Sequence, residues 1–142
     1  MKILSLLIAG MLLCGSCSDD RKTEINPIDI LKNFEENPDL VIRFARLEID
    51  STKLGEYLVF LKEGIETSIA TEPGVLTMYG VQEQEDPTKI TMLEIYLNDS
   101  AYRSHLQTTH FQKYKQGTME MVRSLDLIDL DPVIFGVRDT TD

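Results

Sequence analysis

His105 and His110 are the only two histidines of this chain of 142 residues. Histidine is the side chain whose unperturbed pKa lies nearest neutral pH, so it is the first candidate for a residue that moves a proton. A spacing of five places two side chains about 140° apart on a continuous helix. The two imidazoles therefore converge only if the helix breaks between them, at Thr108-Thr109. Either histidine could instead cap or orient a loop.

A second candidate for proton transfer is Glu94, which lies between apolar neighbours in a stretch typical of a buried strand. An ionised carboxylate is costly there unless it is paired or hydrogen-bonded. We expect its partner to be Arg43, Arg46 or one of the histidines. Burial could instead raise the pKa of Glu94 and make it a proton shuttle, although a structural ion pair is the more frequent outcome.

Aromatic side chains could line a pocket that fits a flat ring, with a phenol positioning a substrate hydroxyl. The candidates are Tyr79, Tyr96, Phe111 and Tyr114. The same residues would equally serve as ordinary core. Two histidines without a matching carboxylate motif do not indicate a zinc site, and no glycine-rich phosphate loop is present. We therefore expect neither a metal nor a phosphate-binding cofactor.

These side chains need a scaffold, and the hydrophobic pattern predicts one of order βαββαβ. Strands are expected at 41–49, 75–81, 90–97 and 125–135, with Pro132 confining the last to an edge or bulge. Helices are expected from 54 to the Glu72-Pro73-Gly74 stop, and from the cap at Asn98 through a break at Thr108-Thr109 to 123. This order predicts an α+β, ferredoxin-like fold with a four-stranded antiparallel sheet covered by helices on one face.

The other face of the sheet is also expected to be apolar, because Leu93 and Ile95 alternate with Met92 and Tyr96. A monomer would expose this face. We therefore expect a symmetric homodimer that packs sheet against sheet. Alternatively, the N-terminal segment or the C-terminal strand folds over it.

The first residues have the pattern of a signal peptide, with Lys2 before an apolar run at 3–13. The run is shorter than the roughly 20 residues of a membrane span. Small residues directly before Cys17 resemble the bacterial lipobox, which implies cleavage there and lipid attachment to its sulfur. The expected organisation is a signal peptide at 1–16, a lipidated polar tether at 17–39, one domain at 40–137 and a tail at 138–142. An ordinary secretory signal or a buried helix is the alternative.

The charge of the chain excludes several partners. The net charge is −10, and −11 once Lys2 is lost with the signal. Such a surface repels phosphate backbones and anionic headgroups, so we expect no nucleic-acid binding and membrane attachment only through the lipid. Ser18-Asp19-Asp20 resembles the export signal of Bacteroidetes surface lipoproteins, which favours the outer membrane or cell surface. A lipid-capped cysteine excludes a disulfide and a thiolate nucleophile.

Four segments together resemble the antibiotic biosynthesis monooxygenase (ABM) family, including its quinol monooxygenases, over roughly 40–136. They are Glu72-Pro73-Gly74-Val75-Leu76, Leu93-Glu94-Ile95-Tyr96, Asn98-Asp99-Ser100-Ala101 and His105-Leu106-Gln107-Thr108-Thr109-His110-Phe111. The resemblance implies a dimeric α/β barrel with a pocket between helices and sheet. It also implies oxygenation of a hydroxylated aromatic without a bound cofactor.

The leading hypothesis is therefore a cofactor-independent quinol monooxygenase. His105, His110 and Glu94 are its candidate catalytic residues, and Arg43 joins the four aromatic residues as a candidate substrate contact. The second hypothesis is a non-catalytic envelope lipoprotein that binds an apolar ligand or a protein, with a closed pocket and histidines bound to main-chain carbonyls. Two further activities of the family are disfavoured. The chain has Tyr96 where the heme-degrading branch uses tryptophan, and it lacks a basic cradle for sugar phosphates.

Overall fold

The computed structural model describes residues 26–138, so the predicted signal peptide and Cys17 lie outside the described residues. The strands are β1 (Val41–Ile49), β2 (Val75–Gln82), β3 (Lys89–Tyr96) and β4 (Val122–Leu130). The helices are α1 (Pro27–Lys32), α2 (Leu54–Thr71), α3 (Asp99–Gln107) and α4 (Thr109–Thr118), with a short 3₁₀ turn, η1 (Phe34–Glu36).

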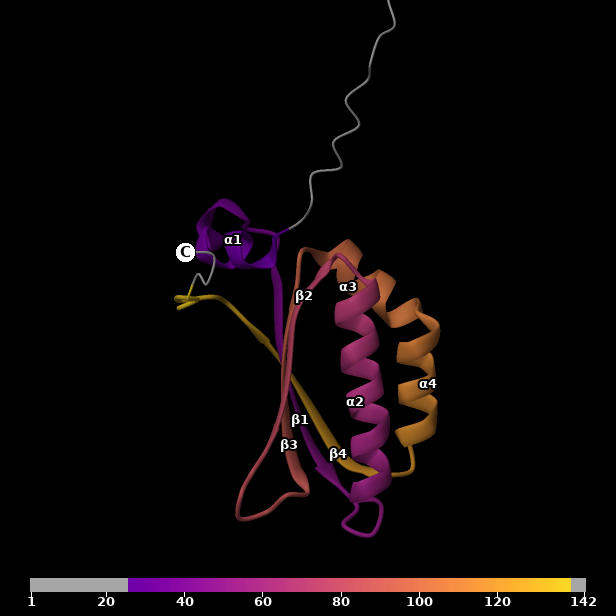
Figure 1. Ribbon diagram of the computed structural model, residues 1–142. Helices are drawn as coiled ribbons and strands as arrows, with labels where there is room; N and C mark the ends of the chain where they lie inside the picture. The colour runs from indigo at the N-terminus through magenta and orange to yellow at the C-terminus, as the bar shows by residue number, and fades with distance from the viewer. Residues whose placement is uncertain (1–25, 139–142) are drawn as a thin grey trace, which may run out of the picture.

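The strands form one antiparallel sheet of order β2-β3-β1-β4, and all three neighbouring pairs are antiparallel. Helices α2, α3 and α4 lie on one side of the sheet, and α1 lies on the other (Figure 1). This arrangement confirms the predicted ferredoxin-like α+β fold. The two central strands, β1 and β3, bury apolar residues on both faces, with Ile42 and Ile95 on the far face and Ala45, Leu47 and Met92 on the helix side.

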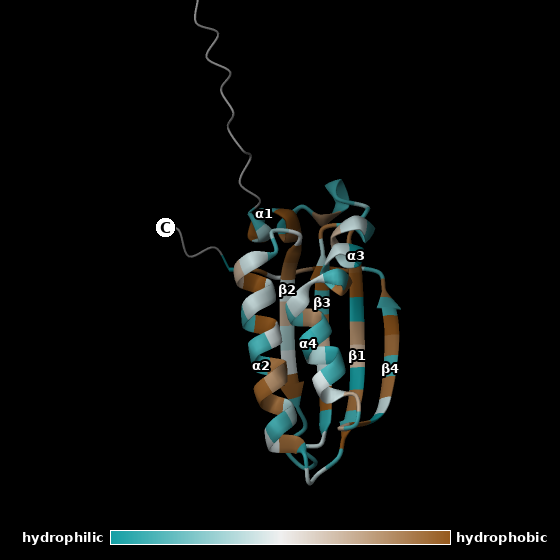
Figure 2. Ribbon diagram, turned by 90° about the vertical axis from the view of Figure 1, so that its right-hand side faces the viewer, coloured by the Kyte–Doolittle hydropathy of each residue, from teal (hydrophilic) through white to brown (hydrophobic). Residues whose placement is uncertain are grey.

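The helical layer does not cover the sheet evenly. Helix α2 lies in front of β2 and α4 in front of β3, whereas none of the helices of residues 26–138 lies in front of β4 at the sheet edge (Figure 2). The core beneath α2 is built around Tyr57, Ile49, Ile90 and Met92, all buried. The helix-side face of β4 is therefore left open, and this opening shapes the candidate site.

The break between α3 and α4 occurs where the sequence predicts it. Asn98 caps α3 by accepting a hydrogen bond from the main-chain N–H of Ala101. Thr108 ends α3 in an extended conformation and caps α4 by accepting the N–H of Phe111. One residue thus stops one helix and starts the next at a new angle.

The predicted continuation of this helix to Arg123 is wrong. Helix α4 ends at Thr118, and the Met121 N–H closes a turn on the Thr118 carbonyl at 2.8 Å. Val122 then pairs with Ile49 in the sheet, so β4 begins there and ends at Leu130 instead of running from 125 to 135. Pro132 lies beyond the strand.

The far face of the sheet is covered at one end by segments from both ends of the described chain. Leu31 of α1 packs with Ile42, Leu76 and Ile95, and the C-terminal Phe135 packs against the same cluster. The rings of Phe34 and Phe135 meet edge-on at 5.4 Å. The alternative covering expected from sequence is therefore realised over part of this face.

None of the helices within residues 26–138 combines the length and apolar character needed to cross a membrane.

Candidate active site

The break at Thr108 brings both histidines onto one carboxylate. Nδ1 of His105, at the end of α3, lies 2.9 Å from Oε1 of Glu72, and Nε2 of His110, at the start of α4, lies 2.6 Å from the same oxygen. Glu72 is the residue at which α2 ends. The side chains are largely buried, with 6% of His105, 12% of Glu72 and 16% of His110 exposed.

The shared oxygen determines which nitrogen of each ring donates a hydrogen bond. An ionised carboxylate only accepts hydrogen bonds, so both imidazoles donate to it, through the Nδ1–H of His105 and the Nε2–H of His110. A neutral His105 then carries its lone pair on Nε2. Among residues 26–138, this atom has no hydrogen-bond partner, and no fully buried side-chain nitrogen or oxygen lacks one. His105 lines the main cavity.

The charge state of Glu72 follows from two opposing effects. Burial raises the pKa of its carboxyl group, while the hydrogen bonds from His105 and His110 lower it and prevail, so the pKa lies below its usual value. Glu72 is thus ionised at neutral pH and remains the acceptor for both rings. An imidazole held by a carboxylate in this way has a fixed orientation and tautomer, which a general base requires.

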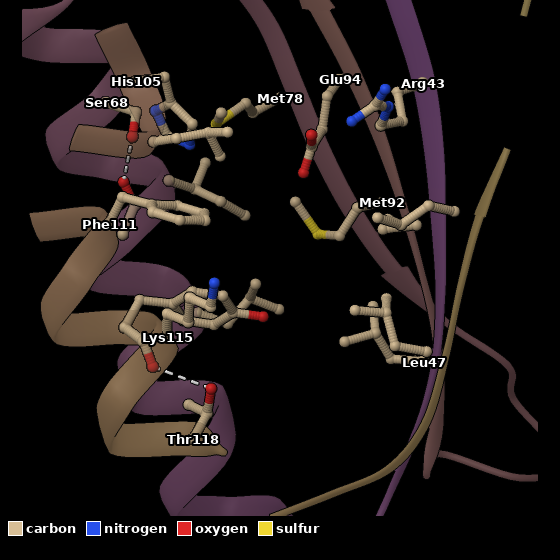
Figure 3. Close-up of a pocket in the computed structure, with 18 of the residues that line it drawn as sticks. Arg43, Leu47, Ser68, Met78, Met92, Glu94, His105, Phe111, Lys115 and Thr118 are labelled. Carbon is tan, nitrogen blue, oxygen red and sulfur yellow. Dashed lines mark hydrogen bonds between the residues drawn. The ribbon is translucent and has the colours of Figure 1, made fainter. Parts of the chain in front are cut away.

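The cavity beside these residues has a volume of about 560 Å³ and lies between the helical layer and the sheet. Its size falls in the range of small-molecule sites. Glu94 extends from the sheet wall into this space, with Met92 farther along the same wall, while His105 and Phe111 occupy the helical wall (Figure 3). A ligand in the cavity would contact an imidazole on one side and a carboxyl group on the other.

Glu94 has a different partner from those the sequence suggested. Its Oε2 accepts a hydrogen bond from the Tyr96 hydroxyl at 3.0 Å, and no arginine or histidine within residues 26–138 hydrogen-bonds to it. Arg43, the predicted partner, lies next to Glu94 in the sheet register but pairs with Asp129 at 2.6 Å. Burial raises the pKa of Glu94, against the lowering effects of the Tyr96 hydroxyl and the charges of His105 and Arg43. This favours a carboxyl group that holds its proton to higher pH than an exposed one.

Three of the four predicted aromatic residues line the cavity: Tyr96, Phe111 and Tyr114. Tyr79 does not, because it points to the opposite face of the sheet, where 63% of it is exposed. The prediction for Tyr79 is therefore wrong, since its neighbour Met78 is the residue of β2 that faces the helices. The sequence analysis also missed Tyr102, which lines the cavity, accepts a hydrogen bond from Arg43 and stacks beneath its guanidinium.

Glu72, His105 and His110 could also together bind a divalent transition metal. Their ligand atoms lie within 4.8 Å of one another, and two imidazoles with one carboxylate are known ligands of zinc and iron. To bind there, a metal would have to take the place of the protons on Nδ1 of His105 and Nε2 of His110. The sequence suggested no metal site because it offered no carboxylate partner for the histidines, and the structure supplies one in Glu72.

Glu72 is the main residue that sequence reasoning missed. It was recognised only as part of the Glu72-Pro73-Gly74 segment that stops α2. Its role depends on packing between residues separated by 33 and 38 positions in the chain. The available signal was that this segment belongs to the same family pattern as the histidine run.

Comparisons with known proteins agree with this architecture. A sequence profile of the family described as "Antibiotic biosynthesis monooxygenase" matches residues 40–117. A structure of a proposed antibiotic biosynthesis monooxygenase from Bacteriodes thetaiotaomicron is 47% identical, with a TM-score of 0.70, over 73% of this chain and 99% of that one. The comparison with curated proteins gave no match.

Two more distant structures are also similar. A proposed monooxygenase from Lactobacillus acidophilus has 28% identity and a TM-score of 0.62, over 66% of this chain and 50% of that one. A proposed antibiotic biosynthesis monooxygenase from Nitrosomonas europaea has 17% identity and a TM-score of 0.63, over 67% and 91%, and shows likeness of fold alone. From the profile match and the 47% identity we conclude that the chain belongs to the antibiotic biosynthesis monooxygenase family.

Proposed function

We propose that this protein is a cofactor-independent monooxygenase that inserts one oxygen atom into a quinol or a related hydroxylated aromatic. The observation that carries the proposal is that His105 and Glu94 face one apolar, aromatic-lined cavity from opposite walls, with His105 held by Glu72. A member of this family with such a cavity can bind a ring and remove a proton from its hydroxyl group.

The first step is deprotonation of a substrate hydroxyl by Nε2 of His105. The resulting imidazolium keeps its Nδ1–H on the Glu72 carboxylate, which stabilises the positive charge as it forms. Positioned proton transfer of this kind contributes about 10²- to 10⁴-fold to a rate. The product of the step is an electron-rich phenolate, which can reduce dioxygen without a redox cofactor.

The phenolate then gives one electron to dioxygen, and the radical pair joins to form a carbon–oxygen bond at the ring. Protonation of the distal oxygen gives a hydroperoxide, which loses water as the C–H bond at that carbon breaks and a carbonyl forms. A quinol and one dioxygen thus yield a hydroxyquinone and one water. All four electrons come from the substrate, so no external reductant is required. Apolar walls protect the intermediates from water.

Glu94 is proposed to bind the second oxygen of the ring. Its Oε2 is occupied by the Tyr96 hydroxyl, and burial raises its pKa. A protonated Glu94 can donate a hydrogen bond to a developing carbonyl or supply the proton for the peroxide. Arg43 acts indirectly in this scheme, because Asp129 and Tyr102 hold its guanidinium.

The non-catalytic alternative receives less support. It predicts a closed pocket and histidines bound to main-chain carbonyls, whereas among the described residues the cavity has about 560 Å³ and both histidines bond to a carboxylate. Homodimer formation and lipid attachment at Cys17 in the cell envelope stay proposals. The first draws support from exposed apolar side chains on the far sheet face, such as Tyr79 and Val81.

Isotope labelling tests the proposed reaction. The purified protein is incubated with a chemically reduced naphthoquinone under ¹⁸O₂, and the product is analysed by mass spectrometry. We expect one ¹⁸O atom in each product molecule and one dioxygen consumed per quinol. Simple oxidation to the parent quinone, without ¹⁸O in the product, would contradict the proposal.

A further inference from the structure

The sheet wall of the cavity changes from polar to apolar along its length. In the sheet register, residues that lie side by side on β3, β1 and β4 form three successive rows on the helix-side face. The rows are Glu94–Arg43–Asp129, then Met92–Ala45–Leu127, then Ile90–Leu47–Leu125. The first row consists of ionisable residues, of which Glu94 and Arg43 line the cavity, and the other two rows are entirely apolar. Leu47 lies four positions after Arg43 along the strand, a distance of about 13 Å.

The helical wall completes the polar end. His105 lies there, opposite Glu94, and Tyr102 caps the Arg43 guanidinium. On the sheet wall, a hydroxylated ring can hydrogen-bond only at this end, because the second and third rows contain no polar side chain. Farther along the cavity, polar side chains come only from the helical side and the start of β4, namely Tyr114, Lys115, Thr118, Arg123 and Ser124, and the hydroxyls of Tyr114 and Thr118 are already hydrogen-bonded within the fold. The ring therefore occupies the first row and leaves the apolar rows to another part of the ligand.

The apolar end opens to solvent along the edge strand. Leu125 and Leu127 are 54% and 53% exposed, and Met119, which follows α4, is 65% exposed. All three line the cavity. Within the described part of the chain no helix lies in front of β4 (Figure 2), so these side chains form an apolar rim instead of a closed core. Large apolar side chains gathered at the mouth of a cavity are typical of a surface that receives an apolar ligand.

The size of the cavity agrees with a two-part ligand. Its volume of about 560 Å³ lies well inside the range of sites for drug-sized molecules. Ala45, in the middle row, lines the same cavity as Glu94 at one end and Leu47 at the other, so the cavity spans all three rows. A single ring would leave the second and third rows exposed to water.

We infer that the substrate is an amphiphile, a hydroxylated aromatic ring that carries an apolar chain. The inference rests on the proposed function for the chemistry of the ring. The ring lies between Glu94 and His105, and the chain runs over Ala45 and Leu47 and leaves the cavity between Met119 and Leu125. The rows of the sheet thus set the specificity: the first recognises the ring, and the other two recognise the chain.

The test measures binding of oxidised ligands, so that turnover plays no part. Calorimetry compares 1,4-benzoquinones with a methyl, propyl or hexyl substituent, all at concentrations where they are monomeric. We expect the affinity to rise about two- to fourfold for each methylene group that is buried. In a Leu125→Ser, Leu127→Ser double variant this rise should largely disappear, while the methyl compound binds as it does to wild type. Val59→Ser, an exposed change on α2, is the matched control and should keep the wild-type trend.

Several results would overturn the inference. One is an affinity of wild type that does not depend on the length of the substituent. A second is an affinity that rises with this length as steeply in the double variant as in wild type. Another is hexanol binding as tightly as the hexyl quinone, since the ring would then not be recognised. A double variant that changes only its sedimentation and not its ligand affinity would show that a second copy covers the rim. Thermal melts establish that each variant is folded.

The outcome separates this inference from the proposed reaction. If the chain-length trend fails but ¹⁸O still enters the product, only the amphiphile inference is wrong. If the trend holds and no ¹⁸O is incorporated, the cavity binds such ligands without oxygenating them.

Discussion

The Oε1 atom of Glu72 lies 2.6 Å from Nε2 of His110 and also accepts the Nδ1–H of His105, so one carboxylate at the end of α2 orients two imidazoles from two other helices. Each helix end contributes one side chain. The arrangement leaves Nε2 of His105 without a hydrogen bond among residues 26–138, in a side chain that lines the cavity, and this is the atom that we propose takes the proton of a substrate hydroxyl.

Replacing this carboxylate should reduce turnover without emptying the cavity. In Glu72→Gln the amide can still accept one imidazole N–H but loses the negative charge that stabilises an imidazolium. We expect kcat for quinol oxygenation to fall about a hundredfold, with little change in KM. Glu66→Gln, an exposed change on the same helix, should leave both constants unchanged. A Glu72→Gln variant with wild-type kcat would contradict the assigned role.

Glu72→Gln should also change how the free energy of unfolding depends on pH in the acid range. The pKa of Glu72 is lowered in the folded state, so its contribution to the free energy of unfolding is present above its usual pKa of 4.5 and is lost as pH falls through the lowered value. Chemical denaturation of wild type should show this loss. Glu72→Gln should be less stable than wild type at neutral pH, and the difference should shrink on acidification.

The contribution of Glu94 to the free energy of unfolding should show the opposite pH dependence. Burial raises its folded pKa above the usual 4.5. Folding thus favours the protonated carboxyl. The stability that Glu94 contributes is present below pH 4.5 and is lost as the pH rises through the raised pKa. Glu94→Gln is neutral at every pH and can still accept the Tyr96 hydroxyl. We expect this variant to melt at a higher temperature than wild type at pH 8 and at the same temperature at pH 4.

Exposed Glu48, on the far face of β1, supplies the control for that measurement. Glu48→Gln should not change the difference between the melting temperatures at pH 8 and pH 4. Equal pH dependence in all three proteins would show that Glu94 is not desolvated.

The sequence predicts more of the fold than of the site. Strand β1 was predicted at its observed bounds because its branched and apolar residues run without interruption by a turn signal. The helix break at Thr108 was predicted from the family pattern and is confirmed by its capping geometry. The end of α4 was not predicted, because Phe111, Tyr114, Thr118 and Val122 keep helical spacing although Val122 belongs to the sheet.

The site was only partly predictable, because its main contact joins distant segments. Glu72 meets His105 only when the end of α2 packs near the α3–α4 break, and no local pattern encodes that meeting. The error on Tyr79 has a related cause. Alternation along β2 defines two faces but does not say which of them meets the helices. That choice depends on the register with β3, where Met78 lies beside Glu94.

Two glycine substitutions should separate packing from helix propensity. A Cβ on Gly117 would lie 2.5 Å from Cε1 of Phe60, whereas a Cβ on Gly55 would meet nothing within 4 Å. Both replacements by alanine gain up to about 1 kcal/mol of helix propensity. In Gly117→Ala this gain is opposed by about 1–3 kcal/mol of overpacking. Denaturant unfolding should find Gly55→Ala more stable than Gly117→Ala, and equal stabilities would contradict the close contact between α2 and α4.

The uncovered part of the far sheet face should mediate dimer formation. Tyr79 and Val81 on β2 are mostly exposed there, and burial of apolar area is the main driving force of association. Analytical ultracentrifugation should find a dimer for wild type and a monomer for a Tyr79→Glu, Val81→Asp double variant. Ile69→Asp, an exposed change on α2, should remain dimeric. A wild-type protein that sediments as a monomer would contradict this expectation.

The measurement that tests the central claim most directly is the initial rate of dioxygen uptake with a reduced quinone, compared between wild type and a His105→Ala, His110→Ala double variant. Both proteins are first shown to be folded by circular dichroism, and the uncatalysed rate is subtracted. If the imidazole held by Glu72 is the base, wild type should be at least about a hundredfold faster. A wild-type rate no higher than that of the double variant would contradict the account.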